Sequence, residues 1–107
     1  MTKKPPSITD IINASAKQFE ISVNDMLNLR KIDHTANRAR LAAIFAAGKA
    51  DYSNKDIANA MNYSSENTIS SKFEKANISF RNQRSDKDIE LTRDVETLAK
   101  TLHIPLV

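Results

Sequence analysis

Four Ser-x-x-Asp segments constrain the fold of this chain more than any other feature of its sequence. In such a capping box, the serine hydroxyl accepts a hydrogen bond from a backbone N–H in the first helical turn, and the acid reaches back to the serine N–H. An acid in the first turn also suits the helix dipole. No alternating, β-rich segment lies between the four, so the sequence predicts an all-α fold. The segments are Ser7–Asp10, Ser22–Asp25, Ser53–Asp56 and Ser85–Asp88.

Apolar residues repeat at helical spacing and predict a compact bundle of about six helices. The clearest stripe is in the fifth helix, where Ile69, Phe73, Ala76 and Phe80 follow one another at intervals of four, three and four residues. The predicted helices run from Ile8 to Phe19, Val23 to Leu29, His34 or Thr35 to Ala47 with an end near Gly48, Asn54 to Met61, Ser65 to Arg81, and Asp86 to Leu102.

A chain of 107 residues fits a single domain. We expect a disordered basic tail over residues 1–6 and one helical domain over residues 7–107. No apolar run approaches the roughly 20 residues that a membrane helix needs. The basic start leads into no signal-peptide segment. The expected location is therefore the cytoplasm, associated with the nucleoid, and no membrane partner is expected.

The composition excludes several classes of function. Gly48 is the only glycine, whereas the loops that cradle phosphates in nucleotide-binding proteins need several. The chain has no cysteine, and its two histidines, His34 and His103, stand in unrelated sequence contexts. No catalytic motif is present. We therefore expect neither an enzyme nor a site for a metal, a cofactor or a nucleotide.

Residues 53–75 have the pattern of a helix-turn-helix, because two short helical segments are separated by a tight polar break. The break contains no glycine and consists of Asn62, Tyr63, Ser64 and Ser65. Basic residues gather around it. Residues 30–84 carry ten Lys or Arg against five Asp or Glu, although the net charge of the chain is only +3. This coincidence favours a phosphate-binding face in the middle of the chain.

From Ile8 to Leu102, the chain resembles the C-terminal DNA-binding domain of the bacterial replication initiator DnaA, a helical domain of the Trp-repressor-like class. "ITDIINASAKQFEISVNDMLNLRK" is similar to its opening helix, short second helix and basic loop, and "ARLAAIFAA" to its arginine-containing helix. The resemblance of residues 53–76 to its helix-turn-helix needs no gaps and places Ile57, Met61, Ile69 and Lys75 on their counterparts. It implies a stand-alone module that binds double-stranded DNA and regulates replication or transcription.

The chain departs from that family at the start of the second helix of the motif. The family's Gly, Gly, Arg, Asp, His, Thr, Thr, Val is replaced by residues 62–69, in which only Thr68 is kept, with Ile69 in place of valine. The Asp-His-Thr trio of the family reaches base edges in the major groove. Its positions are occupied here by Ser65, Glu66 and Asn67. The resemblance therefore implies the scaffold of the family and not its target sequence.

The first turn of this helix supplies the predicted base-reading residues, Ser65, Glu66, Asn67 and Thr68, because a helix that enters the major groove presents its N-terminal turn to base edges. Asn67 can bind adenine N6 and N7, and Glu66 can accept from cytosine N4. Thr68 can offer its hydroxyl or its methyl group to thymine. The alternative is that Ser65 and Glu66 only cap the helix and charge its start.

Further polar and basic residues suit phosphate contacts, which fix the register of a protein on DNA without reading sequence. The resemblance implies that Arg30 or Lys31, in the basic loop, reaches the minor groove. For Arg38 and Arg40 the sequence leaves two alternatives, phosphate binding or pairing with acids of the last helix. For Arg40 we expect phosphate binding. The other predicted phosphate contacts are Asn54, Lys55, Ser64, Ser71, Lys72 and Lys75.

A second class of function stays open from the sequence. The altered trio favours a protein-interaction module, or an anti-initiator, that docks on a replication initiator or another regulatory protein without reading DNA. The clustered basic residues argue for DNA binding instead, since they suit phosphates.

Overall fold

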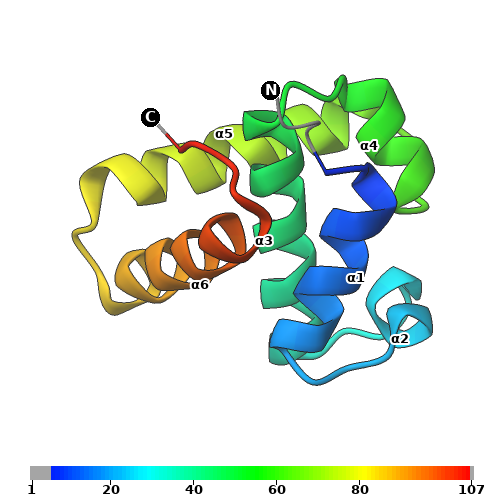
Figure 1. Cartoon of the computed structure of the whole chain (residues 1–107), viewed down its shortest axis with the longest axis horizontal. Coiled ribbons are helices and arrows are strands. Elements are labelled where there is room, and N and C mark those ends of the chain that lie inside the picture. Colours follow the sequence, from blue (N-terminus) through cyan, green and yellow to red (C-terminus); the bar gives the residue numbers. More distant parts are fainter. Residues whose placement is uncertain (1–5, 107) are drawn as a thin grey trace.

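The computed structural model describes residues 6–106, and this part of the chain consists of six α-helices without a strand (Figure 1). The all-α prediction and the number of helices are thereby confirmed. The helices are α1 (Ile8–Gln18), α2 (Val23–Leu27), α3 (His34–Lys49), α4 (Asn54–Ala60), α5 (Glu66–Asn82) and α6 (Asp86–Leu102).

All four predicted serine caps are present at helix starts. In each, the serine Oγ accepts a hydrogen bond from the N–H of the aspartate three residues later, at 3.0–3.2 Å. The aspartate returns the bond in the first and last segments, at 3.3 Å. The remaining two helices, α3 and α5, are capped by Asp33 and Ser65. Local hydrogen bonding therefore accounts for every helix start.

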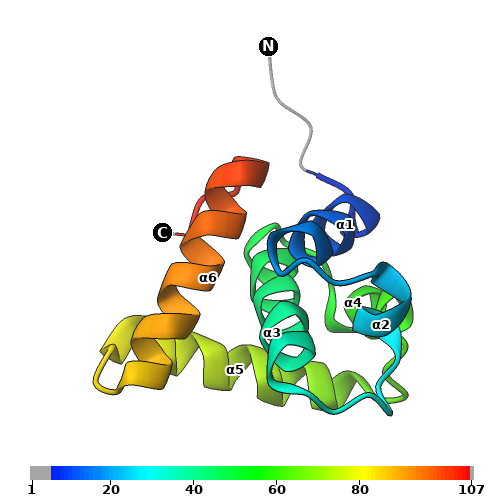
Figure 2. The same cartoon turned by 90° about the horizontal axis from the view of Figure 1, so that it is seen from below.

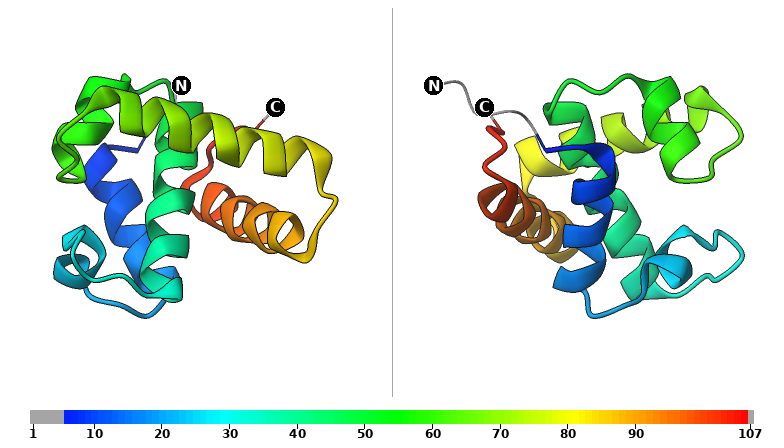
Figure 3. Two further views of the ribbon diagram at one scale, coloured as in Figure 1. Left: turned by 180° about the vertical axis from the view of Figure 1, so that it is seen from behind. Right: turned by 45° about the vertical axis from the view of Figure 1, so that its right-hand side comes forward.

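α3 is the central helix and contacts all five others (Figures 1 and 3). Its segment 42–47 is buried throughout, and the four alanines in it let neighbouring helices approach closely. Ile44 and Phe45 fill the centre of the core and are completely buried. Burial of such a side chain stabilises a fold by about 1.5–3 kcal/mol. α5 crosses α3, and α6 packs against both of these helices (Figure 3).

α3 runs through Gly48 and ends at Lys49, which agrees with the predicted end near Gly48. The phenyl ring of Phe73, on α5, lies against this glycine and occupies the space that a side chain would need. The glycine marks a close crossing of two helices, which is a tertiary feature and has no local signal in the sequence.

α2 ends at Leu27, two residues before the predicted end. The chain takes an extended conformation at Asn28 (φ −84°, ψ 94°). The guanidinium group of Arg40 donates to the carbonyl oxygens of Met26 and Asn28 at 2.7 and 2.6 Å. These carbonyls have a side-chain donor in place of helical N–H groups, so the chain can leave the helix here and turn toward α3.

The start of the described chain is attached to the body of the protein. The carbonyl oxygen of Pro6 accepts a hydrogen bond from the hydroxyl of Tyr52 at 2.7 Å. Residues 1–5 of the predicted disordered tail lie outside the described residues. Among residues 6–106, no helix combines the length and the apolar character that crossing a membrane requires.

Candidate nucleic-acid interface

The turn between α4 and α5, residues 61–65, is closed without glycine. Asn62 has a φ of 66°, a left-handed conformation that asparagine tolerates better than most residues. The N–H of Tyr63 donates to the carbonyl oxygen of Ala58 at 2.9 Å, and the Asn62 amide donates to that of Leu27 at 3.2 Å. These bonds close α4 and tie the turn to the end of α2. The start of α5 is therefore fixed relative to the loop that follows α2.

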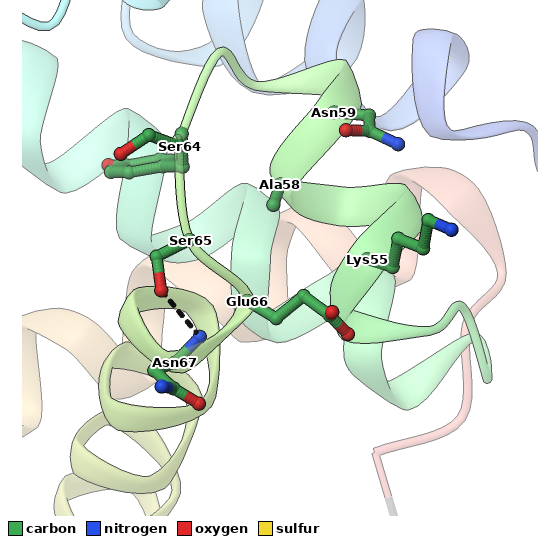
Figure 4. A pocket seen from close by; sticks show the side chains of 8 residues that line it. Lys55, Ala58, Asn59, Ser64, Ser65, Glu66 and Asn67 are labelled. Atoms are coloured by element: carbon green, nitrogen blue, oxygen red, sulfur yellow. Dashed lines mark hydrogen bonds between the residues drawn. The ribbon is translucent and has the colours of Figure 1, made fainter.

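The first turn of α5 is presented to solvent. Glu66 and Asn67 are exposed, whereas Thr68 is half-buried. The Oγ of Ser65 accepts a hydrogen bond from the N–H of Asn67 at 3.2 Å (Figure 4), so Ser65 caps the helix, as one of the two sequence alternatives stated. Of the four predicted base-reading residues, Glu66 and Asn67 are thus the two whose side chains are most available to a ligand.

A polar hollow of about 370 Å³ lies between the starts of α4 and α5 (Figure 4). It is lined by Lys55 from α4, by Ser64 from the turn and by Glu66 from α5. In Figure 4 the Glu66 carboxylate extends toward α4, whereas the Asn67 amide points away from it. A carboxylate repels phosphate, and so this position of Glu66 suits a hydrogen-bond donor such as the exocyclic amine of a base.

A second hollow, which we name the basic hollow, has a volume of about 280 Å³ and lies between α3 and α5. Its lining includes Arg40, Tyr63, Lys72 and Lys75. The ammonium group of Lys72 lies 5.8 Å from the centre of the Tyr63 ring. Burial raises the pKa of Tyr63, and the charge of Arg40 opposes that rise, so the hydroxyl stays protonated and able to donate at neutral pH. Three positive charges around one hollow attract an anion such as phosphate.

Arg40 itself is a structural residue. It is only 5% exposed, and its guanidinium group donates to the carbonyl oxygens of Met26, Asn28 and Lys31 at 2.6–2.9 Å. Another N–H binds the side chain of Asn37 at 3.0 Å. Buried carbonyl groups need such donors, and Arg40 holds the loop after α2 against α3. We therefore remove Arg40 from the predicted phosphate contacts and keep only its contribution to the positive field of the basic hollow.

Arg38 pairs with α6, which was the second alternative for this residue. Its Nε and Nη2 bind the two carboxylate oxygens of Asp94 at 3.0 and 2.8 Å, and Glu90 lies 3.4 Å from Nε. The hydrogen bond to Asp94 raises the pKa of Arg38, against the effect of burial. The guanidinium group also lies over the Phe19 ring, 5.1 Å from its centre. Because its donors are engaged in the contact between α3 and α6, Arg38 is also removed from the predicted phosphate contacts.

The other predicted contacts lie at the surface. Arg30 and Lys31 are exposed in the loop 28–33. Lys31 pairs with Asp25 at 3.0 Å, and both side chains are nearly half exposed. An exposed pair of this kind contributes about 0–1 kcal/mol, so a phosphate can replace the aspartate at little cost. The remaining residues are exposed on α4, on the turn and on α5: Asn54, Lys55, Ser64 and Ser71.

The loop 28–33 and the start of α5 lie on the same side of the molecule. Figure 2 places both at one edge, and in the right-hand view of Figure 3 the loop after α2 and the turn before α5 extend in the same direction. Arg40 connects them, because it binds the loop and lines the basic hollow beside α5. We name this surface the polar face. Its charged and amide residues are Arg30, Lys31, Lys55, Glu66, Asn67, Lys72 and Lys75.

Two residues near the polar face were not predicted from the sequence. Tyr63 lines both hollows, and its signal was an aromatic residue within an otherwise polar break. Ile32 is 82% exposed in the basic loop. The sequence does not show whether an isoleucine in a loop packs into the core or faces solvent, so its exposure could not be predicted.

The described residues offer no arrangement of metal-binding type. Within residues 6–106, no three histidine, aspartate or glutamate side chains lie close enough together to hold a metal ion. His34 lies 3.3 Å from Glu90 with most of its ring exposed, and His103 forms the C-cap of α6. Neither histidine is surrounded by further ligands.

No protein-family model, no curated protein and no solved structure matches this chain. The resemblance to the DNA-binding domain of DnaA thus rests on the residues quoted above and stays a prediction. The function has to be inferred from the polar face itself.

Proposed function

We propose that this chain binds double-stranded DNA in a sequence-specific manner and that α4 and α5 act as a helix-turn-helix similar to that of the DnaA C-terminal domain. The observation that carries the proposal is the exposure of Glu66 and Asn67 at the N-terminus of a 17-residue helix that is flanked by the basic hollow. A helix of this kind enters the major groove with its first turn against the base edges.

Phosphate binding in this proposal falls to the lysines of the polar face. Lys72 and Lys75 follow the first turn of α5 and would meet the DNA backbone at the basic hollow. Lys55, at the start of α4, would meet a second phosphate position, and Arg30 and Lys31 would approach the neighbouring minor groove. Contacts of this type release counterions and give affinity that depends on salt but not on sequence.

Sequence reading falls to Glu66 and Asn67. An asparagine pairs well with adenine and a glutamate accepts from cytosine, and each good pair discriminates against the wrong base by about 1–3 kcal/mol. Glu66 lowers affinity for any duplex because it repels phosphates. Its place beside Lys55 limits that repulsion, since the lysine offsets part of the charge. A replication or transcription regulator at the nucleoid is the role that the resemblance supports.

The experiment that tests the proposal is selection from a pool of random duplexes with the purified protein, followed by binding measurements at several salt concentrations. We expect one preferred site, and an affinity that falls linearly with salt on a logarithmic scale. Failure to enrich any duplex, together with binding that does not respond to salt, would show that the proposal is wrong.

A protein-interaction module is the second candidate, and the acids on α5 favour it. Glu66 and Glu74 are both exposed on the helix that would face DNA. In that case the same selection enriches no duplex, and the protein binds a replication initiator or another regulatory protein. Reversal of charge with Glu66→Lys would then weaken the protein complex, whereas it would strengthen non-specific binding to DNA.

A further inference from the structure

Ile32 is the most exposed of the large hydrophobic side chains in the described part of the chain, with 82% of its surface accessible. The next is Ile78, at 51%. Ile32 lies in the loop 28–33, directly after Arg30 and Lys31. A single exposed isoleucine is common on protein surfaces, so it is the place of Ile32 beside Arg30 and Lys31, and not its exposure alone, that indicates a partner.

The backbone on both sides of Ile32 is held in place. The carbonyl oxygen of Lys31 accepts from the buried guanidinium group of Arg40 at 2.9 Å, and the N–H of Lys31 donates to the carbonyl oxygen of Asn28 at 3.0 Å. On the other side, the carboxylate of Asp33 accepts from the N–H of Ala36 at 2.7 Å and caps α3. These bonds fix the backbone on both sides of Ile32, whose side chain is directed to solvent. The loop therefore holds this side chain in an outward position.

The position and the charge of the loop indicate what covers Ile32. The loop lies on the same side as the start of α5 (Figures 2 and 3). If the first turn of α5 binds in the major groove of a duplex, the neighbouring minor groove would therefore face the loop. Arg30 and Lys31 precede the isoleucine and suit the phosphates on either side of that groove. An apolar protein partner would gain nothing from these two charges.

We propose that Ile32 is an apolar wedge that inserts from the minor groove between two base pairs, and that the protein bends the DNA it binds. This inference rests on the proposed DNA-binding function and adds an activity to it. Wedges of this type partly unstack a base step and kink the duplex by about 20–90° toward the major groove. A flexible pyrimidine–purine step is expected at that place in the preferred site, because it is the easiest to unstack.

The test uses the full chain and a duplex that the unmutated protein has enriched from the random pool. Fluorescent dyes at the two ends report bending by energy transfer, and 2-aminopurine at successive positions reports unstacking. The variants are Ile32→Ser and Ile32→Ala, which shorten the wedge, and Ile32→Leu, which keeps it. Ile78→Ser is the matched control, because this isoleucine is also exposed but lies three turns from the start of α5.

We expect the unmutated protein, Ile32→Leu and Ile78→Ser to bend the duplex and to raise the fluorescence at one step. Ile32→Ser and Ile32→Ala should lose both signals and still bind the same site. If Ile32→Ser and Ile32→Ala bend and unstack the duplex as much as the unmutated protein does, the wedge proposal is wrong. The proposed function would then be unaffected. If the unmutated protein binds no duplex at all, the proposed function fails and the wedge fails with it. If the two variants lose only self-association, seen by sedimentation, Ile32 covers a protein surface and the wedge is also overturned.

Discussion

The ring of Phe73 packs directly on the backbone of Gly48, and a β-carbon added to Gly48 would lie 2.3 Å from the Cε2 atom of Phe73. The ring is not free to move away, because it also stacks on Phe45, with 5.3 Å between the ring centroids. This contact lies where α5 crosses α3. The absence of a side chain at residue 48 therefore sets how closely the helix of the polar face approaches the central helix.

Gly48→Ala is expected to lower the free energy of unfolding by about 1–3 kcal/mol, as overpacking of a core does. The effect is expected although alanine favours a helix by about 1 kcal/mol over glycine. Denaturant unfolding followed by circular dichroism measures it. The matched experiment introduces Gly48→Ala into a Phe73→Leu background, where the ring is gone and the substitution should cost less. An equal cost in the two backgrounds would show that the ring is not the cause.

Arg40→Ala should lower the free energy of unfolding by about 1.5–3 kcal/mol or more, since a hydrogen bond to a charged group contributes this much and the substitution removes several. Arg40→Lys should recover little of the loss, because one ammonium group cannot reach carbonyl oxygens that are spread over residues 26–31. Chemical denaturation measures both variants. A fully stable Arg40→Ala protein with a reduced salt dependence of DNA binding would instead support the phosphate role that the sequence suggested.

The outline of the fold could be predicted from the sequence, because its signals are local. A serine and an aspartate three residues apart cap the same helix, and so Ser7, Ser22, Ser53 and Ser85 marked four starts without knowledge of the rest of the chain. The end of α3 was also predicted, within one residue, near Gly48. The reason for a glycine at this position could not be predicted in this way. A glycine ends many helices, but only the ring of Phe73, 25 residues away, shows that this one also makes room for a helix crossing.

The candidate site was predicted less completely, because some of its contacts join residues that are distant in the sequence. Glu66 and Asn67 were located correctly at a helix start, since the cap at Ser65 is a local feature. Arg40 was assigned to phosphate from the local density of basic residues and from the resemblance to the DnaA domain. Its partners in the structure are mainly backbone carbonyls, which give no signal in the sequence. Arg38 left two possibilities open, and the choice depended on Asp94, which is 56 residues away.

Lys72→Ala and Lys75→Ala should each weaken binding to all duplexes alike and should each reduce the slope of log affinity against log salt by about one. The physical reason is that a lost phosphate contact leaves one counterion bound to the DNA. Fluorescence anisotropy at several salt concentrations measures the slope. Lys100→Ala is the matched control, because this lysine is exposed in the last turn of α6 and the proposal gives it no phosphate. If the control changes the slope as much as the other two, the basic hollow does not hold the DNA backbone.

Asn67→Ala should flatten base preference at one position of the selected site and leave the other positions unchanged. Glu66→Ala should weaken the base preference at a different position of the site. The affinity of this variant for non-specific duplexes should stay the same or rise, because a charge that repels phosphate is removed. Each lost contact should cost about 1–3 kcal/mol of discrimination, and adenine opposite Asn67 and cytosine opposite Glu66 are the expected partners. The preferred site should therefore differ from that of the family, whose base-reading trio is not present in this chain.

Both variants are to be compared in a single selection experiment on short duplexes, with Ser70→Ala as the control, since Ser70 is exposed on α5 just beyond the first turn. Neither Glu66 nor Asn67 contributes to the core, so both variants should stay folded, and Glu66→Ala should lose only the roughly 0.3–1 kcal/mol that an acid contributes in a first helical turn. A change in preference can then be attributed to the lost contact. If both variants select the site of the unmutated protein, α5 does not read bases through its first turn. In that case the specificity would have to come from the shape of the duplex, which the loop at Ile32 would sense.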